Sequence, residues 1–330
     1  MKKILGQAGL VLFYILFICA SGEVLIRTIS KFKLMYNVEM LKYVTTFQTR
    51  SDDPALTHVH RPNVSARFMG VQVTLNSMGH RSKEIQFPKS TNEKRIMAVG
   101  SSVTMGWGVP QDQVFTALVE SRLNQDRKDS GALYTAVNAG IANFNTVHQA
   151  ALFGQQADRV QPDLLVVNYF LTDADPIPRQ KDNPLLKRSL FFGFLYQKWE
   201  GLRASPSGKS PGDHYRELYT DGNPDWELSK EGIRQMKDLC AARKIKMVIL
   251  ITPNPHNLAK DSPYPAIYEK MAATFQGMGI DVINTYPAFY EQYGQNPSQL
   301  WVAVGDPHPN ANGHRVMADE LYRYLTTHAI

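Results

Sequence analysis

From residue 95 to the end of the chain, short apolar runs alternate with segments in which apolar residues recur every three or four positions. The most apolar of these runs, Leu164–Val167, contains no polar side chain and follows Pro162. Such a run is typical of a strand buried on both faces, and the segments between the runs are typical of amphipathic helices. The alternation therefore predicts an α/β fold with a parallel sheet between helices, in which active sites lie at the carboxyl ends of strands.

The sequence also predicts where these elements lie. Strands are expected at 96–99, 133–138, 164–167, 246–252 and 281–284, and helices near 115–123, 146–158, 233–240, 266–278 and 311–327. Upstream, residues 65–75 place apolar side chains largely on alternate positions, which predicts a strand or a hairpin. Residues 57–90 are therefore expected to form a β-rich prelude to the main sheet.

The N-terminus carries an uncharged run from Ile4 to Gly22, preceded by Lys2 and Lys3. A helix of this length nearly spans a hydrocarbon core of about 30 Å. The positive flank favours an N-in orientation, which Lys31 and Lys33 on the far side weaken but do not reverse. We expect a single-pass anchor in the bacterial inner membrane with the rest of the chain facing the periplasm. A cleaved signal peptide is the alternative, although Ile18-Cys19-Ala20 is a poor cleavage site.

Charge, cysteine content and glycine pattern indicate which ligands and cross-links are not expected. The 330 residues include 36 Lys and Arg against 30 Asp and Glu, a net charge of +6 without a basic run interleaved with aromatic residues. Nucleic-acid binding is therefore not expected. Cys19 and Cys240 are not expected to meet, so no disulfide and no cysteine-based metal site is expected. The glycine string near residue 100 lacks the dinucleotide-binding pattern, and we expect no cofactor and no metal.

The stretch Arg95–Val109 joins the expected strand at 96–99 to a turn of small residues. A strand end is rigid and small residues leave room for a substrate, so a serine in this turn would be both held and accessible. Ser102 is the candidate nucleophile. A serine hydroxyl also needs a histidine oriented by a carboxylate. The segment Gly305–His314, just ahead of the last expected helix, contains both residue types.

Four sequence blocks, taken in order, resemble those of the SGNH (GDSL-type) hydrolases. They are Gly100-Ser101-Ser102-Val103-Thr104-Met105-Gly106, Asn138-Ala139-Gly140-Ile141-Ala142-Asn143, Asn168-Tyr169-Phe170-Leu171-Thr172-Asp173 and Asp306-Pro307-His308. The resemblance implies a flavodoxin-like three-layer fold. It also implies that Ser102 is the nucleophile, His308 the general base and Asp306 the residue that orients His308. His314 is the rival base, but its place inside the last helix suits a structural role.

The resemblance further implies an oxyanion hole made of the N–H groups of Ser102 and Asn143 and the side chain of Thr172. Three positions depart from the usual family residues: Ser101 replaces Asp, Asn143 replaces Gly and Thr172 replaces Asn. Asn143 can still offer its N–H group, and the Thr172 hydroxyl can donate one hydrogen bond. A specialised enzyme and a degenerate site are both consistent with these changes.

The anchor and the blocks together divide the chain into 1–26 as signal anchor, 27–94 as stalk and β-rich prelude, and 95–330 as an SGNH hydrolase-like domain. The short Asp-x-His spacing is similar to that of the polysaccharide-acetylation branch of the superfamily. We therefore expect a membrane-anchored esterase or O-acetyltransferase acting on O-acyl esters, in particular O-acetyl esters, of a cell-surface or exported polysaccharide. Polysaccharide biosynthesis or export machinery would be its partner. The alternatives are a lipid or thioester hydrolase and a non-catalytic glycan-binding or assembly protein.

An insertion at about 174–228 interrupts the alternation. It contains a Pro, Gly and Ser cluster at Ser205–Gly212 and the aromatic run Ser189–Trp199. Core packing, a lid over the ester site and an interfacial contact beside the anchor are all consistent with such a run.

Overall fold

The computed structural model describes residues 2–32, 35–127, 131–176, 188–203 and 210–328. The chain forms two compact units: Met1–Phe47 with Gln180–Gly208, and Gln48–Arg179 with Lys209–Ile330. These units divide the chain differently from the ranges expected from the sequence. Residues 48–94 belong with the sheet, and part of the insertion belongs with the N-terminal helices.

The larger unit is built on a five-stranded parallel sheet. Its strands are β5 (Glu93–Gly100), β6 (Leu133–Asn138), β7 (Leu164–Phe170), β8 (Lys246–Thr252) and β9 (Asp281–Asn284). The spatial order is β6-β5-β7-β8-β9, and every neighbouring pair is parallel. Counted along the chain, this is the order 2-1-3-4-5 of flavodoxin-like folds. The expected fold class is confirmed, and the order reverses between β5 and β7, where such folds bind their ligands.

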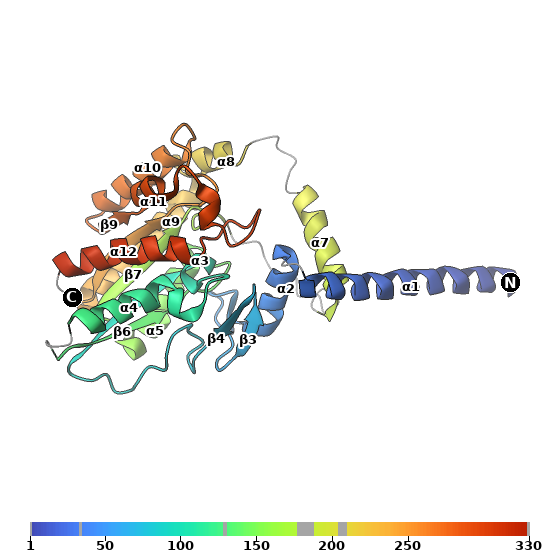
Figure 1. Cartoon of the computed structure of the whole chain (residues 1–330), viewed down its shortest axis with the longest axis horizontal. Coiled ribbons are helices and arrows are strands. Elements are labelled where there is room, and N and C mark those ends of the chain that lie inside the picture. The colour runs from blue at the N-terminus through green and yellow to red at the C-terminus, as the bar shows by residue number, and fades with distance from the viewer. Residues whose placement is uncertain (1, 33–34, 128–130, 177–187, 204–209, 329–330) are drawn as a thin grey trace. The chain divides into compact units, whose positions relative to one another are not determined.

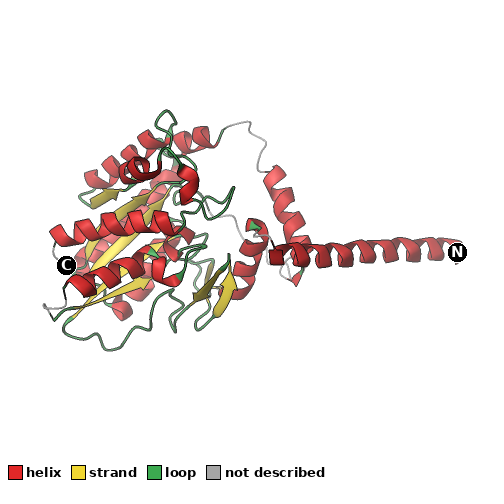
Figure 2. Ribbon diagram, in the orientation of Figure 1, coloured by secondary structure: helices red, strands yellow, loops and turns green. Residues whose placement is uncertain are grey.

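Helices cover both faces of this sheet (Figures 1 and 2). Helices α4 (Phe115–Asp126) and α12 (Ala311–Thr327) pack together on one face, and α5 (Thr146–Val160) and α9 (Pro224–Arg243) on the other. The other helices that the structure describes in this unit are α3 (Ser102–Met105), η1 (Gln111–Gln113), α8 (Pro211–Leu218), α10 (Tyr264–Gly277), α11 (Tyr286–Tyr293) and η3 (Pro297–Leu300). All seven side chains of β7 are buried, including the apolar run Leu164–Val167 for which burial on both faces was expected.

Local sequence explains several of the boundaries. The side chains of Asn145, Asn223 and Asn310 cap α5, α9 and α12 by accepting N–H groups of the first turn. Strands β6, β8 and β9 and helix α12 have the bounds that the sequence predicts, whereas α5 continues two residues beyond Asp158.

Two small antiparallel pairs precede the sheet. Strand β1 (Gln48–Arg50) pairs with β2 (His58–His60), and β3 (Ser65–Phe68) pairs with β4 (Val71–Thr74). Of the strand or hairpin expected in residues 65–75, the hairpin is the one present. Its turn has Met69 at φ 48° and Gly70 at φ 78°, the positive values that tight two-residue hairpins require.

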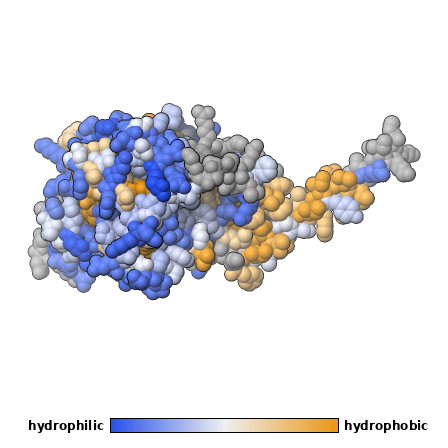
Figure 3. Space-filling model, turned by 90° about the horizontal axis from the view of Figure 1, so that it is seen from above, coloured by the Kyte–Doolittle hydropathy of each residue, from blue (hydrophilic) through white to orange (hydrophobic). Residues whose placement is uncertain are grey.

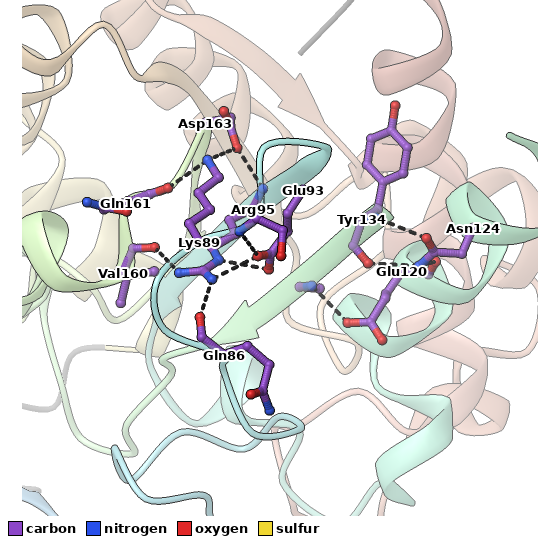
Figure 4. A network of polar contacts seen from close by, with 12 residues as sticks. Gln86, Lys89, Glu93, Arg95, Glu120, Asn124, Tyr134, Val160, Gln161 and Asp163 are labelled. Carbon is purple, nitrogen blue, oxygen red and sulfur yellow. Dashed lines mark hydrogen bonds and ion pairs between the residues drawn. The ribbon is translucent and has the colours of Figure 1, made fainter. Parts of the chain in front are cut away.

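A buried ion-pair network fixes the start of β5 (Figure 4). The Arg95 side chain is fully buried and forms two 2.8 Å hydrogen bonds with the Glu93 carboxylate. It also donates to the carbonyls of Val160, at 2.9 Å, and Gln86, at 2.5 Å. The Arg95 N–H donates to Asp163 at 2.7 Å. A buried charge is tolerated when its donors are satisfied in this way, and the network anchors the strand that leads to Ser102.

The smaller unit contains α1 (Lys2–Phe32), α2 (Tyr36–Phe47) and α7 (Leu190–Arg203). Within the described chain, one helical segment, Gly9–Phe32, is long and apolar enough to cross a membrane. Its side chains are mostly exposed and form an apolar surface (Figure 3). The helix runs six residues beyond the expected anchor boundary at 26. Lys33 and most of the cluster Ser205–Gly212 lie outside the described residues.

Candidate active site

Ser102 is placed by a tight turn at the carboxyl end of β5. A Cβ atom on Gly100 would lie 2.9 Å from the carbonyl oxygen of Asn168, so a side chain there would force the strands apart. Ser101 precedes the short helix α3, and Ser102 is its first residue. The helix ends after one turn at Gly106, which has φ 86°. The hydroxyl of Ser102 is therefore held by a rigid strand end and remains partly exposed.

Ser102, His308 and Asp306 form one hydrogen-bonded relay. The Oγ atom of Ser102 lies 2.7 Å from Nε2 of His308, and Nδ1 of His308 lies 2.6 Å from Oδ1 of Asp306. The His308 and Asp306 side chains are almost completely buried. Because the carboxylate accepts the proton on Nδ1, Nε2 is left as the acceptor for the serine O–H. The structure thus brings Ser102 together with the pair Asp306 and His308, although His308 lies 206 positions later in the chain.

The Asp306 carboxylate has further donors that hold it in place. Its Oδ1 atom also accepts the His308 N–H at 3.0 Å, and its Oδ2 atom accepts Nε1–H of Trp107 at 3.0 Å. The Trp107 ring also stacks on the His308 ring, with centroids 5.2 Å apart and an angle of 22° between the planes. On the backbone side, the carbonyl of Asp306 contacts Nε2 of His256 at 2.7 Å. These contacts fix the orientation of the carboxylate and the imidazole.

Trp107 is itself positioned by the buried guanidinium of Arg81. Arg81 donates to the carbonyls of Met105 at 3.0 Å, Gly106 at 2.5 Å and Val109 at 2.6 Å, and to Oε1 of Gln111 at 2.8 Å. All four acceptors are uncharged. Burial lowers the pKa of Arg81 to about 10, so the group remains charged at neutral pH. Arg81 therefore shapes the loop that follows Ser102.

The sequence did not single out Arg81, Trp107 or His256 as part of the site. Trp107 offered a weak signal, since it stands between two glycines, Gly106 and Gly108, in the turn of small residues that follows Ser102. Arg81 offered none, because three of its acceptors are backbone carbonyls, and every residue has one.

The two remaining oxyanion candidates lie at the same edge of the sheet as Ser102. Asn143 follows β6 in a turn at φ 66°, a conformation that Asn adopts more readily than most residues. Thr172 lies in the turn after β7, and both side chains are exposed. Their role at an oxyanion stays a prediction.

Asp173, the residue after Thr172, is buried. Its Oδ2 atom accepts Nε2–H of Gln149 at 2.8 Å, and its carbonyl accepts both the N–H and the O–H of Thr146 at 2.9 Å. Burial raises the pKa of Asp173 to about 7. The buried hydroxyl of Ser101 lies close enough to oppose this rise, although it forms no hydrogen bond of good geometry with the carboxyl group.

His314, the rival base, is engaged elsewhere. Its Nδ1 atom accepts the N–H of Phe115 at 3.2 Å, and its ring stacks on the Phe115 ring. Burial lowers the pKa of His314 to about 3, so the ring is neutral. A histidine whose lone pair is already used inside the fold is structural, as its position in the last helix suggested.

Two surface hollows lie away from the relay. One, of about 800 Å³, is lined by residues that include Arg81, Gln111 and Glu120, and the other, of about 390 Å³, includes Arg216 and Lys270. Neither is lined by Ser102, Asp306 or His308. Among the described residues, no group of three or more His, Cys, Asp or Glu side chains could hold a metal ion.

No family model and no curated protein matches the chain. The solved structures similar to it include TesA, with 17% identity over 71% of this chain and 99% of that one and a TM-score of 0.45. The psychrotrophic esterase EstA from Pseudoalteromonas sp. is 12% identical over 71% and 97%, with a TM-score of 0.44. A mutant of Axe2, an acetyl-xylooligosaccharide esterase from Geobacillus Stearmophilus, is 15% identical over 70% and 93%, with a TM-score of 0.45.

Proposed function

We propose that this chain is an SGNH-type serine enzyme that cleaves O-acyl esters. One observation carries the proposal: the continuous relay from the Ser102 hydroxyl through His308 to the buried carboxylate of Asp306. A serine is a poor nucleophile without a base, and an imidazole in the wrong tautomer cannot accept its proton. The relay supplies both the base and its correct tautomer, and it lies where the strand order of the sheet reverses, between β5 and β7.

The geometry supports a two-step reaction. Ser102 Oγ attacks the ester carbonyl while Nε2 of His308 takes its proton, and Asp306 stabilises the imidazolium. The N–H groups of Ser102 and Asn143 and the Thr172 hydroxyl would hold the oxyanion, each donor worth about 10²–10³ in rate. The alcohol then leaves with the proton from His308, and Ser102 keeps the acyl group. Water acting through His308 releases the acid in an esterase, whereas a sugar hydroxyl accepts the acyl group in a transferase.

The substrate we propose is the O-acetyl ester of a cell-surface or exported polysaccharide. The Asp-x-His spacing supports this class through the resemblance described above, and α1 supports a location at a membrane. We propose that α1 anchors the chain in the bacterial inner membrane with the catalytic unit on the periplasmic side, where polysaccharide export machinery would be its partner. An enzyme held there would meet glycans as they leave the cell.

Hydrolysis of 4-nitrophenyl acetate by the full-length protein tests the reaction class. Ser102→Ala should abolish turnover. Ser101→Ala is the matched control, because it removes the neighbouring hydroxyl and leaves the relay intact. Equal activity of the wild type and Ser102→Ala would exclude Ser102 as the nucleophile.

Substrate choice then separates the remaining possibilities. We expect acetyl esters to be cleaved faster than long-chain acyl esters, and acetylated oligosaccharides to release acetate or pass it to an added acceptor sugar. A preference for long-chain esters would favour a lipid or thioester hydrolase. A folded wild type without any turnover would favour a binding protein.

A further inference from the structure

A carboxylate from α1 caps the first turn of α7. Glu23 accepts the N–H of Leu190 at 3.2 Å, the N–H of Phe191 at 2.9 Å and the hydroxyl of Ser189 at 2.7 Å. The first N–H groups of a helix have no partner within the helix, and a negative charge at that end is favourable. Glu23 satisfies them from more than 160 positions away, so α7 begins at a defined place beside α1.

The two helices also approach closely next to this cap. A Cβ atom on Gly22 would lie 2.6 Å from the Phe191 ring, so the aromatic ring occupies the space that a side chain would fill. Small residues allow such close contact between helices that lie in membranes. The glycine and the cap together fix α7 on α1 at residues 22 and 23.

Helix α7 carries an apolar stripe that the protein leaves partly exposed. Phe192, Leu195 and Trp199 follow one another at intervals of three and four residues, so they share one face of the helix. The exposed fraction is 45% for Leu195 and 56% for Trp199. On α1, Val24 and Leu25 beside the cap are also exposed, at 64% and 57%. An aqueous exterior would disfavour this apolar surface.

The position of the cap along α1 identifies what covers this surface. Glu23 is the first charged residue after the uncharged run Ile4–Gly22, so it marks the end of the uncharged part of the helix. If α1 crosses a membrane, Glu23 and the start of α7 lie at its boundary. Aromatic side chains concentrate at that depth, and helices with an apolar aromatic face lie there in the plane of the interface.

We propose that α7 is an interfacial helix whose Phe192, Leu195 and Trp199 side chains enter the lipid leaflet at the Glu23 end of α1. The proposal rests on the membrane insertion of α1 proposed above, and its occupant is the lipid surface itself. Lys198, whose Nζ lies 5.6 Å from the centroid of the Phe194 ring, would keep its charge at the headgroups while its stem lies along apolar surface. None of the relay residues Ser102, Asp306 and His308 takes part in this contact.

Depth measurements on the full-length protein in lipid nanodiscs test the proposal. Single cysteines carrying a nitroxide label are placed at Leu195, Glu200 and Ile15, in a background with Cys19→Ser and Cys240→Ala. Glu200 is the matched control, because it is exposed on the same helix about a quarter-turn away from the stripe. Collision rates with oxygen and with a water-soluble nickel chelate then give the depth of each label.

The expected order of depth is Ile15 deepest, Leu195 about 5–10 Å below the headgroup boundary, and Glu200 in water. A label at Leu195 as accessible to the nickel chelate as the one at Glu200, with Ile15 deep, would overturn the proposal and leave the anchor intact. A water-accessible Ile15 label would overturn the anchor and the proposal together.

A change at the cap gives a second readout. Glu23→Leu removes the acceptors and should move the Leu195 label toward water and increase its mobility. Glu23→Gln keeps an acceptor and should shift the label less. Labels unaffected by Glu23→Leu would show that the cap does not hold α7 at the membrane.

Discussion

The two ends of β5 each rely on a buried arginine, and the two guanidinium groups are held in opposite ways. At the amino end, Arg95 pairs with the carboxylate of Glu93. At the carboxyl end, Arg81 binds three carbonyls and one amide oxygen, all uncharged. The first arrangement neutralises a charge and fixes a strand. The second leaves the charge uncompensated and uses the guanidinium fork to shape the loop that carries Trp107 to Asp306. We therefore expect the amino end to control stability and the carboxyl end to control chemistry.

The largest expected effect removes the base at the carboxyl end. His308→Gln should lower kcat on an acetyl ester by about 10⁴-fold, because the Ser102 proton then has no acceptor of suitable basicity. The urea midpoint should change little, since the amino-end network is untouched. Retained turnover at the wild-type rate would mean that His308 is not the base.

Replacing each arginine by lysine compares the two ends directly. Arg95→Lys should lower the free energy of unfolding by roughly 2 kcal/mol, because lysine cannot form the paired bonds to Glu93, and should leave kcat per active site unchanged. Arg81→Lys should lower kcat by about 10–100-fold, because a misplaced Trp107 loop shifts Asp306 and His308. Urea denaturation and kinetics normalised by active-site titration measure both effects. If both variants lost stability and kcat to the same extent, the two ends of β5 would not differ in the way proposed.

Acid should weaken the fold through three buried histidines of the larger unit. Burial lowers the pKa of His60 to about 3, of His80 to about 4 and of His314 to about 3. These histidines bind a proton near pH 6.5 in the unfolded chain but stay neutral at that pH in the folded chain. Their contribution to stability is therefore present above pH 6.5 and is lost as the pH falls below it. Between pH 7 and pH 5 each of these histidines should lower the free energy of unfolding by roughly 2 kcal/mol.

Asp173 opposes this loss, because its raised pKa of about 7 lets the folded state bind a proton that the unfolded chain binds only near pH 4. The net loss between pH 7 and pH 5 should be on the order of 3 kcal/mol. Urea denaturation at the two pH values measures it, and His80→Gln should reduce it. Equal stability at both pH values would contradict the buried, neutral state of these rings.

The smallest effect isolates one hydrogen bond. Trp107→Phe keeps an aromatic ring over His308 but removes the N–H that Asp306 accepts. Hydrogen bonds to charged groups contribute from about 1.5 kcal/mol upward, and the low end of that range corresponds to a roughly tenfold fall in kcat. Kinetics on an acetyl ester measure the change, and unchanged kcat would limit Trp107 to a packing role.

The same contrast explains what could be predicted from the sequence. Strands such as β7 and β8 could be located because burial on both faces imposes apolar runs. Ser102, Asp306 and His308 could be named because their segments resemble the blocks of the SGNH hydrolases. Arg81 could not be identified, since its partners are carbonyls that meet only in the folded loop. For the aromatic run that forms α7, the sequence could not decide between core packing, a lid and an interfacial contact. The contact of α7 with α1 depends on Glu23 and Gly22, which lie more than 160 residues away.

Mapping the site of covalent modification tests the catalytic relay most directly. The full-length protein is treated with a fluorophosphonate and digested, and the modified peptide is sequenced by mass spectrometry. We expect one adduct, on Ser102 and not on Ser101, that forms at least about 10³-fold more slowly in His308→Gln. An adduct on another residue, or an equal rate of modification in the folded His308→Gln variant, would contradict a nucleophile activated by the Ser102–His308–Asp306 relay.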